Sequence, residues 1–171
     1  MLTVRPMKPG DDFHAAAQVY VDSWKHAYQG LVPQRYLDKL QPDGFISLLR
    51  ADPSANLILE ENGQIVGTAY VSFARDELRE GYGEIVSLYL LPSATGKGYG
   101  KLLLQAALNQ CRENGLTHAM LWVLSDNHHA CHFYERMGLE KSGRTKTDAI
   151  GGAELPLTEY IVRLDDSGQS I

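Results

Sequence analysis

The feature that most constrains this chain is a run of glycines set between an apolar strand and an amphipathic helix. Residues 84–91 are typical of the strand, and Gly100 to Arg112 are typical of the helix. Gly96, Gly98 and Gly100 let the backbone adopt positive φ and approach a ligand closely. Together with the free amides and the dipole at the start of the helix, they predict an anion site suited to a diphosphate.

The glycine run alone leaves two interpretations open, an anion site and a turn that only connects a strand to a helix. A P-loop is excluded, because it requires Ser or Thr after its lysine and Lys101 is followed by Leu102. The dinucleotide fingerprint is excluded as well, because it requires Gly-x-Gly-x-x-Gly and these glycines are spaced Gly-x-Gly-x-Gly. If an anion binds, Lys97 or Lys101 would add positive charge to the amides.

Hydrophobic periodicity predicts one mixed α/β domain over residues 1–165, followed by a polar, frayed tail over 166–171. Asn62-Gly63 between two alternating runs indicates a hairpin. We expect strands over 3–5, 56–60, 65–71, 84–91, 118–124 and 158–164. We expect helices over 13–24, 33–40, 45–49, 100–112 and 127–137, and a loop over 145–157 before the last strand.

The composition excludes several classes of protein. With 44% hydrophobic residues among 171, the chain can bury a core without disulfides or a structural metal. Cys111 and Cys131 lie in apolar helical patterns, which favours reduced thiols and a cytoplasmic protein. The chain starts without a signal-peptide pattern and no apolar run approaches about 18 residues, so we expect no membrane association. A net charge of −5 and scattered basic residues argue against nucleic acid and suit a cationic ligand.

The strand, Pro92 and the glycines resemble the acetyl-CoA-binding segment of the GNAT superfamily of N-acetyltransferases. Its pattern is Arg/Gln-x-x-Gly-x-Gly/Ala after an apolar strand and a proline. Gly98 and Gly100 match this pattern, whereas Thr95 stands where Arg or Gln is usual. That departure keeps the backbone amides but removes a side chain that helps to hold the loop.

A second segment resembles the other marker of the superfamily, Asn-x-x-Ala-x-x-Phe-Tyr-Glu-x-x-Gly-Phe. The matching residues are Asn127, Ala130, Phe133, Tyr134, Glu135 and Gly138. Two independent motifs in the expected order are more specific than either alone. The resemblance implies a central, mostly antiparallel twisted sheet flanked by helices. It also implies a splay between the strand that ends near Leu91 and the strand His118–Leu124.

The resemblance implies roles for particular residues in binding acetyl-CoA. The glycine segment would hold the pyrophosphate; it consists of Thr95, Gly96, Lys97, Gly98, Tyr99, Gly100 and Lys101. Main-chain groups of Leu88, Tyr89 and Leu90 would pair with the pantetheine as an added strand would. Asn127, which caps a helix, would also contact the cofactor.

Two residues are the candidates for catalysis that the resemblance implies. Tyr134 would donate a proton to the departing thiolate, although core packing is the alternative for an aromatic residue at this spacing. Glu84 would act as general base, directly or through a water relay, and the alternative is a carboxylate that faces water. The N–H of Leu90 would polarise the thioester carbonyl. We expect direct attack by the amine, because neither cysteine sits in a motif of an activated nucleophile.

The acceptor is expected to be a primary amine of a small molecule or peptide, bound by the first two helices and by residues 145–157. Trp24, His26, Tyr28 and Tyr36 are the candidates, and packing between helices is the alternative for these aromatic residues. Trp122 stands where enzymes that acetylate ribosomal-protein N-termini usually carry Glu, which disfavours that subclass.

We predict no metal, although His128 and His132 lie four residues apart on one helical face, because a companion carboxylate is absent and solvated surface histidines explain the pattern. A homodimer is left open. Two other functions are also left open, a catalytically idle acetyl-CoA sensor of the same fold and a mononucleotide-binding protein.

Overall fold

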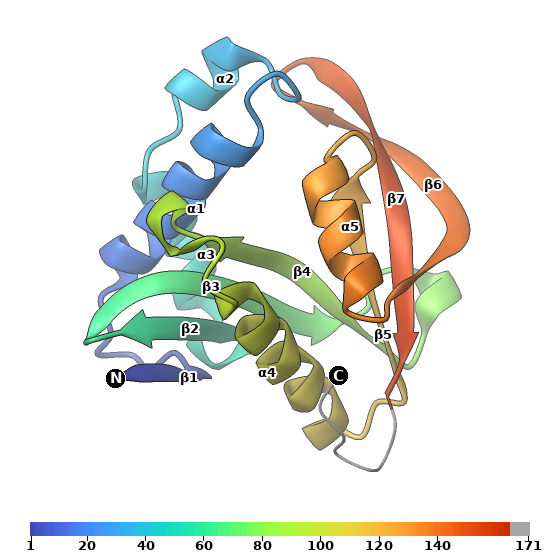
Figure 1. Cartoon of the computed structure of the whole chain (residues 1–171), viewed down its shortest axis with the longest axis horizontal. Helices are drawn as coiled ribbons and strands as arrows, with labels where there is room; N and C mark the ends of the chain where they lie inside the picture. The colour runs from blue at the N-terminus through green and yellow to red at the C-terminus, as the bar shows by residue number, and fades with distance from the viewer. Residues whose placement is uncertain (165–171) are drawn as a thin grey trace.

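The computed structural model describes residues 1–164 as one seven-stranded sheet flanked by helices (Figure 1). The predicted tail over 166–171 lies outside the described residues. The strand order is β1-β2-β3-β4-β5-β7-β6. The strands are β1 (Leu2–Pro6), β2 (Asn56–Glu61), β3 (Gln64–Phe73), β4 (Tyr82–Leu90), β5 (His118–Leu124), β6 (Glu140–Ile150) and β7 (Ala153–Arg163). The helices are α1 (Phe13–Ala27), α2 (Gln34–Asp38), α3 (Asp43–Ala51), α4 (Tyr99–Glu113) and α5 (His128–Arg136).

The predicted splay is confirmed at the centre of the sheet. Every neighbouring pair of strands is antiparallel except β4 and β5, which are parallel. These two strands pair only from Tyr82–Glu84 to His118–Met120 and then diverge (Figure 1). The sheet therefore consists of two halves that are joined by hydrogen bonds at one end and parted at the other.

Helices cover both faces of the sheet and enclose three apolar clusters. The largest cluster contains Leu103, Leu104 and Leu108 of α4 together with Cys131 and Tyr134 of α5. A second cluster packs α1 and α3 on the N-terminal half of the sheet. The third cluster joins α2 and the residues just before it to the end of β5 and to the middle of β7, so it bridges the two halves beyond the splay.

The starts of the helices differ in a way that bears on function. The Asp12 carboxylate caps α1 by accepting from the N–H of Ala15, and Asn127 caps α5 by accepting from the N–H of Ala130. No side chain caps α4, whose N-cap residue is Gly98, or the shorter helices α2 and α3, whose N-cap residues are Pro33 and Pro42; among the three, only α4 follows the glycine segment. The first-turn amides of α4 are therefore left for another acceptor.

The expected loop over 145–157 is wrong, because those residues belong to a long hairpin of β6 and β7. The β6 strand is at the edge of the sheet and most of its side chains are exposed, so its sequence carries no alternating apolar pattern. The last strand accordingly begins at Ala153 rather than at Thr158. Gly151 and Gly152 form the tip of the hairpin with positive φ values of 62° and 84°.

Candidate active site

The end of β4 presents backbone groups to the splay. The N–H of Leu91 donates to β3 at 2.9 Å. Residues of an antiparallel strand alternate between bonding one neighbour and pointing away from it. Tyr89 therefore also bonds β3, whereas Leu88 and Leu90 direct their N–H and C=O groups toward the opposite edge. Since β5 has left that edge beyond Glu84, an extended ligand could pair there like an added strand.

The glycine segment forms an open turn at the start of α4, which is a candidate anion site. Gly96 and Gly98 have φ values of 75° and 80°, and Gly98 is the N-cap residue in the left-handed conformation. A methyl group added to either glycine would have no neighbour within 4 Å, so the turn faces open space. The uncapped amides and the helix dipole point to the same place, as an anion requires.

Side chains of the glycine segment tie it to the neighbouring strand. The Nζ of Lys97 lies 3.4 Å from Oε2 of Glu61, and the hydroxyl of Tyr99 donates to the same carboxylate. The hydroxyl of Thr95 donates to the carbonyl of Pro92 at 2.8 Å, which closes the turn locally. Lys97 is therefore engaged with Glu61, whereas Lys101 is exposed in the first turn of α4.

Asn127 is the N-cap residue of α5 and Tyr134 lies within that helix, which follows β5 on the other side of the splay. Oδ1 of Asn127 accepts from the N–H of Ala130 at 3.2 Å, which leaves Nδ2 to donate elsewhere. A methyl group on Gly100 would lie 3.3 Å from Cζ of Phe133, so α5 contacts the first turn of α4. This contact brings the helix that carries Tyr134 against the glycine segment.

Tyr134 is a buried phenol rather than an exposed one. Its ring centre lies 5.2 Å from that of Phe133 and 6.2 Å from that of Tyr160. Burial raises the pKa of Tyr134 above its ordinary value, and the neighbouring Tyr28 and Cys131 add to the effect. The phenol therefore holds its proton throughout the physiological range, which a proton donor needs.

Glu84 lies at the closed end of the splay, where it pairs with Met120 across the ladder. Its side chain is 5% exposed, and Oε1 lies 2.7 Å from Nη2 of Arg75. Oε2 accepts from the backbone N–H and from Nε of Arg75, both at 3.2 Å. A carboxylate held by three such bonds can act as a base only through a water relay or after Arg75 moves.

Three of the four aromatic candidates for acceptor binding come together on α1 and α2. The ring centre of Trp24 lies 4.9 Å from that of Tyr28, 6.3 Å from that of Tyr36 and 6.4 Å from that of Tyr89. The indole Nε1 of Trp24 is buried, and no hydrogen-bond partner lies within bonding geometry among the described residues. His26 is exposed and does not join this group.

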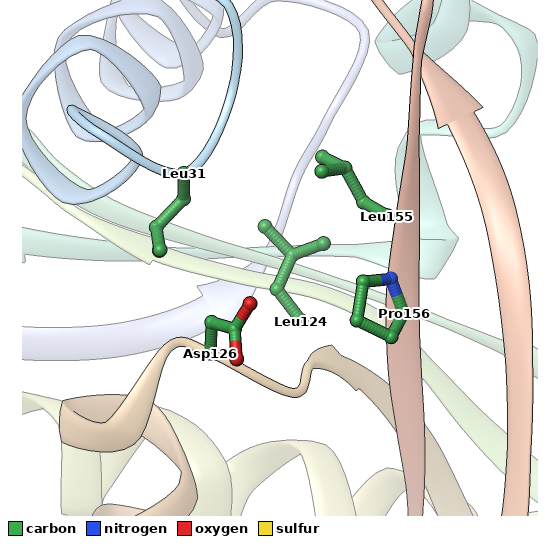
Figure 2. A pocket seen from close by; sticks show the side chains of 5 residues that line it. All are labelled: Leu31, Leu124, Asp126, Leu155 and Pro156. Atoms are coloured by element: carbon green, nitrogen blue, oxygen red, sulfur yellow. The ribbon is translucent and has the colours of Figure 1, made fainter.

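A small hollow adjoins these aromatic residues, between the α1–α2 segment and β7. Figure 2 shows the side chains that line it, which are Leu31, Leu124, Asp126, Leu155 and Pro156. Four of them are apolar, and the carboxylate of Asp126 points toward the centre between them. The hollow therefore offers an apolar wall and one negative charge on the side of the splay opposite the glycine segment.

The β6–β7 hairpin reaches across to α2, a contact that the sequence did not reveal. A Cβ atom on Gly151 would lie 2.7 Å from Cβ of Tyr36, so only glycine fits there. A buried charge cluster, also missed, fastens the base of the hairpin, because the fully buried Glu159 accepts from Arg79 and Arg144. The spacing of these residues along the chain gives no signal of either contact.

The described residues contain no group of three or more His, Cys, Asp and Glu side chains that could hold a metal ion. His128 and His132 are exposed, which agrees with solvated surface histidines. In addition, no helix over residues 1–164 is long and apolar enough to cross a membrane.

A sheet with parted central strands, an uncapped glycine turn and a tyrosine-bearing helix beside it together define a domain of the acetyltransferase class. The sequence comparison agrees, since the model of the "Acetyltransferase (GNAT) family" matches residues 16–139. The chain belongs to the GNAT family.

The curated relatives include proteins with different names. Mycothiol acetyltransferase of Streptomyces avermitilis is 33% identical over 138 residues, which are 80% of this chain and 42% of that protein. The uncharacterized N-acetyltransferase YuaI of Bacillus subtilis is 31% identical over 130 residues, which are 74% of each chain. This chain thus spans about two-fifths of the length of the mycothiol acetyltransferases that it matches.

Solved structures show the same fold. An N-acetyltransferase from Staphylococcus aureus has a TM-score of 0.72 at 22% identity, with 96% of this chain and 99% of that chain covered. The yncA protein of Salmonella typhimurium, solved with acetyl-CoA, has a TM-score of 0.69 at 22% identity, with 99% and 98% covered. The PaiA N-acetyltransferase of Thermoplasma acidophilum, solved with coenzyme A, scores 0.68 at 21% identity, with 93% and 98% covered.

Proposed function

We propose that this protein transfers an acetyl group from acetyl-CoA to a primary amine of a small molecule or peptide. The observation that carries the proposal is the end of β4, where Leu88 and Leu90 direct their backbone groups into the splay. The uncapped start of α4 and the buried phenol of Tyr134 flank the same opening. Acetyl-CoA is an extended thioester with a diphosphate. The diphosphate suits the start of α4, the extended pantetheine suits the end of β4, and the thioester suits a position beside Tyr134.

Each part of acetyl-CoA has a candidate partner. The diphosphate is received by the amides that follow Gly96, with Lys101 beside them, and the pantetheine pairs with Leu88 and Leu90. The N–H of Leu90 donates to the thioester carbonyl and stabilises the oxyanion that forms when the amine attacks. Asn127 contributes its free Nδ2 at the other side of the splay.

The acceptor amine must be neutral when it attacks. A lysine-like amine with pKa of about 10.4 is neutral in about one molecule in 2,500 at pH 7, which costs about 4.6 kcal/mol. An α-amine with pKa near 8 costs only about 1.4 kcal/mol. Because Glu84 is bound to Arg75, the site suits an α-amine or another weakly basic amine, with Glu84 assisting through water.

Direct attack is supported by the state of the two cysteines. Both thiols are buried. Burial raises the pKa of Cys111 to about 11, which keeps it protonated and unreactive at neutral pH. Cys131 directs its sulfur toward backbone carbonyls of residues 124 and 125. Neither residue is placed to form an acyl intermediate.

Calorimetry with acetyl-CoA, CoA and ATP tests the cofactor. We expect micromolar binding of acetyl-CoA and CoA, and much weaker binding of ATP. Binding of ATP alone would favour a mononucleotide site, and no binding of acetyl-CoA at high micromolar concentration would overturn the proposal. A panel of an alkylamine, an aminosugar, an amino acid and a lysine peptide, read by mass spectrometry, then tests transfer. Binding without transfer to any amine would favour the idle sensor.

A further inference from the structure

The end of β4 is held from the side of α1 by Tyr20, a residue that the proposed reaction has not used. The hydroxyl of Tyr20 lies 3.0 Å from Oγ of Ser87, and the two groups share a hydrogen bond. The ring of Tyr20 also packs edge-on against the ring of Tyr89, with 5.1 Å between the ring centres. Tyr20 therefore contacts both neighbours of Leu88, Ser87 through its hydroxyl and Tyr89 through its ring.

A bulge in β4 places Ser87 and Tyr89 where Tyr20 can reach them. On β3, Tyr70 and Ser72 lie two residues apart and share one face of the sheet. Their partners on β4, Ser87 and Glu84, lie three residues apart, so β4 contains one extra residue between them. Ser87 consequently lies on the same face of the sheet as Glu84, which a regular strand would not allow.

The part of β4 that follows the bulge has little support from other strands. A bulge disrupts the ladder and bends the strand. Among residues 1–164, only β3 pairs with β4 beyond Glu84, because β5 has separated from it. The backbone groups of Leu88 and Leu90 face that open edge. Their position therefore depends on the ladder with β3 and on side-chain contacts such as those that Tyr20 makes.

Tyr20 is itself held firmly in the N-terminal half of the domain. It lies within α1, and the whole residue is only 3% exposed. Its ring stacks on Phe45 of α3 with 5.0 Å between the ring centres, and it belongs to the cluster that packs α1 and α3 on the sheet. A side chain that packing has already fixed can hold a neighbouring strand accurately.

We propose that Tyr20 is a positioning residue for acetyl transfer, which fixes the bulged end of β4 so that the N–H of Leu90 meets the thioester carbonyl. The inference rests on the proposed function. Tyr20 acts through Ser87 and Tyr89 and takes no part in moving protons. Its role matters because a backbone donor stabilises the oxyanion only when it is held in advance at hydrogen-bond distance.

The positioning role is tested with Tyr20→Phe, Ser87→Ala and the double variant, using acetyl-CoA and the amine of the panel that is turned over fastest. Each single change removes the hydrogen bond and keeps the rings at positions 20 and 89. Misplacing a group by about 1 Å can cost about 10²-fold in rate, so we expect kcat to fall by about five- to fiftyfold. Affinity for CoA, measured by calorimetry, should fall as well, because the pantetheine pairs with the displaced strand.

Three further readouts separate positioning from other roles. The KM of the amine and the shape of the kcat–pH profile should stay the same. Groups that act as one unit are strongly non-additive, so the double variant should be no slower than the slower single variant. Thr158→Val is the matched control, because it removes a hydroxyl pair, Thr158 with Ser125 at 2.7 Å, from the other half of the sheet. It should lower the melting temperature and leave kcat and CoA affinity unchanged.

Several outcomes would overturn the positioning role while leaving acetyl transfer intact. A lower melting temperature with full kcat and full CoA affinity would show that the bond is only structural. Losses that multiply in the double variant, or a kcat–pH profile of altered shape, would show that the two hydroxyls act separately or transfer protons. If Tyr20→Phe does not fold, Ser87→Ala decides alone, because it removes the same bond from a half-buried position. Failure of the unaltered protein to acetylate any amine would refute the proposed function and the positioning role with it.

Discussion

The contact between Gly151 and Tyr36 closes the β6–β7 hairpin onto α2, and replacing that glycine by alanine tests its importance. The added methyl would lie 2.7 Å from Cβ and 2.9 Å from Cγ of Tyr36. Because Cβ is fixed to the backbone of α2, rotation of the Tyr36 side chain cannot relieve the clash. Either the hairpin tip or α2 must move.

The chain offers a matched control in the adjacent glycine. Gly152 also has positive φ, 84° against 62°, but a methyl there would meet only the flexible end of Arg35 at 3.6 Å. A left-handed alanine costs about 1–2 kcal/mol, which both variants share. Overpacking adds about 1–3 kcal/mol to Gly151→Ala alone. We therefore expect a difference in melting temperature between the variants of roughly 2–12 °C, at about 2–4 °C per kcal/mol for a chain of this size.

Urea unfolding of both variants measures this difference directly. If the hairpin tip also shapes the acceptor side, Gly151→Ala should raise the KM of the amine while calorimetry finds unchanged affinity for CoA. Equal unfolding free energies for Gly151→Ala and Gly152→Ala would refute the steric argument. An equal loss of CoA affinity and rise in the KM of the amine would refute the separation of the two sides of the splay.

Two further predictions concern pH. Burial raises the pKa of Tyr20, Tyr89 and Tyr134 in the folded chain. As the pH rises, these phenols therefore ionise in the unfolded chain before they ionise in the folded chain. The free energy of unfolding should be retained below about pH 10 and should fall above it. Urea midpoints between pH 8 and 11, with absorbance at 295 nm, check this; a constant midpoint would contradict it. The hydrogen bond from Arg5 lowers the pKa of Asp11, and Arg5 also bonds Glu60, so Arg5→Gln should cost about 1–2 kcal/mol at pH 7. This difference should shrink as Asp11 is protonated below about pH 4, and a pH-independent difference would show that the Arg5–Asp11 pair contributes through packing alone.

Much of the fold was predictable because the apolar pattern of most helices and strands in the sequence matches the face that the structure buries. The strand His118–Leu124 is buried over most of its length, as its apolar sequence predicts, and its bounds were predicted without error. The helix cap at Asn127 was predicted from a polar residue before an apolar helical pattern. The edge strand β6 was missed because its stability comes from pairing with β7 and not from burial of its own side chains.

The candidate site was predictable only where it depends on motifs. The glycine segment and Tyr134 were found in this way, and they remain candidates until activity is measured. The partner of Glu84 was not predictable, because Arg75 follows a strand whose register shifts by a bulge opposite β4. The effect of Tyr28 on the pKa of Tyr134 was not predictable either, because Tyr28 follows α1 and Tyr134 lies in α5, more than one hundred positions later in the chain.

The uncapped start of α4 has a consequence for the stability of the whole chain. A helix whose first amides are satisfied by a bound anion draws part of its folding free energy from that anion. Amide hydrogens from Tyr99 to Lys101 should then exchange with solvent quickly in the free protein and slowly in the complex. The melting temperature should likewise rise with the concentration of acetyl-CoA, so the amount of intact protein in a cell would follow the supply of its own acetyl donor.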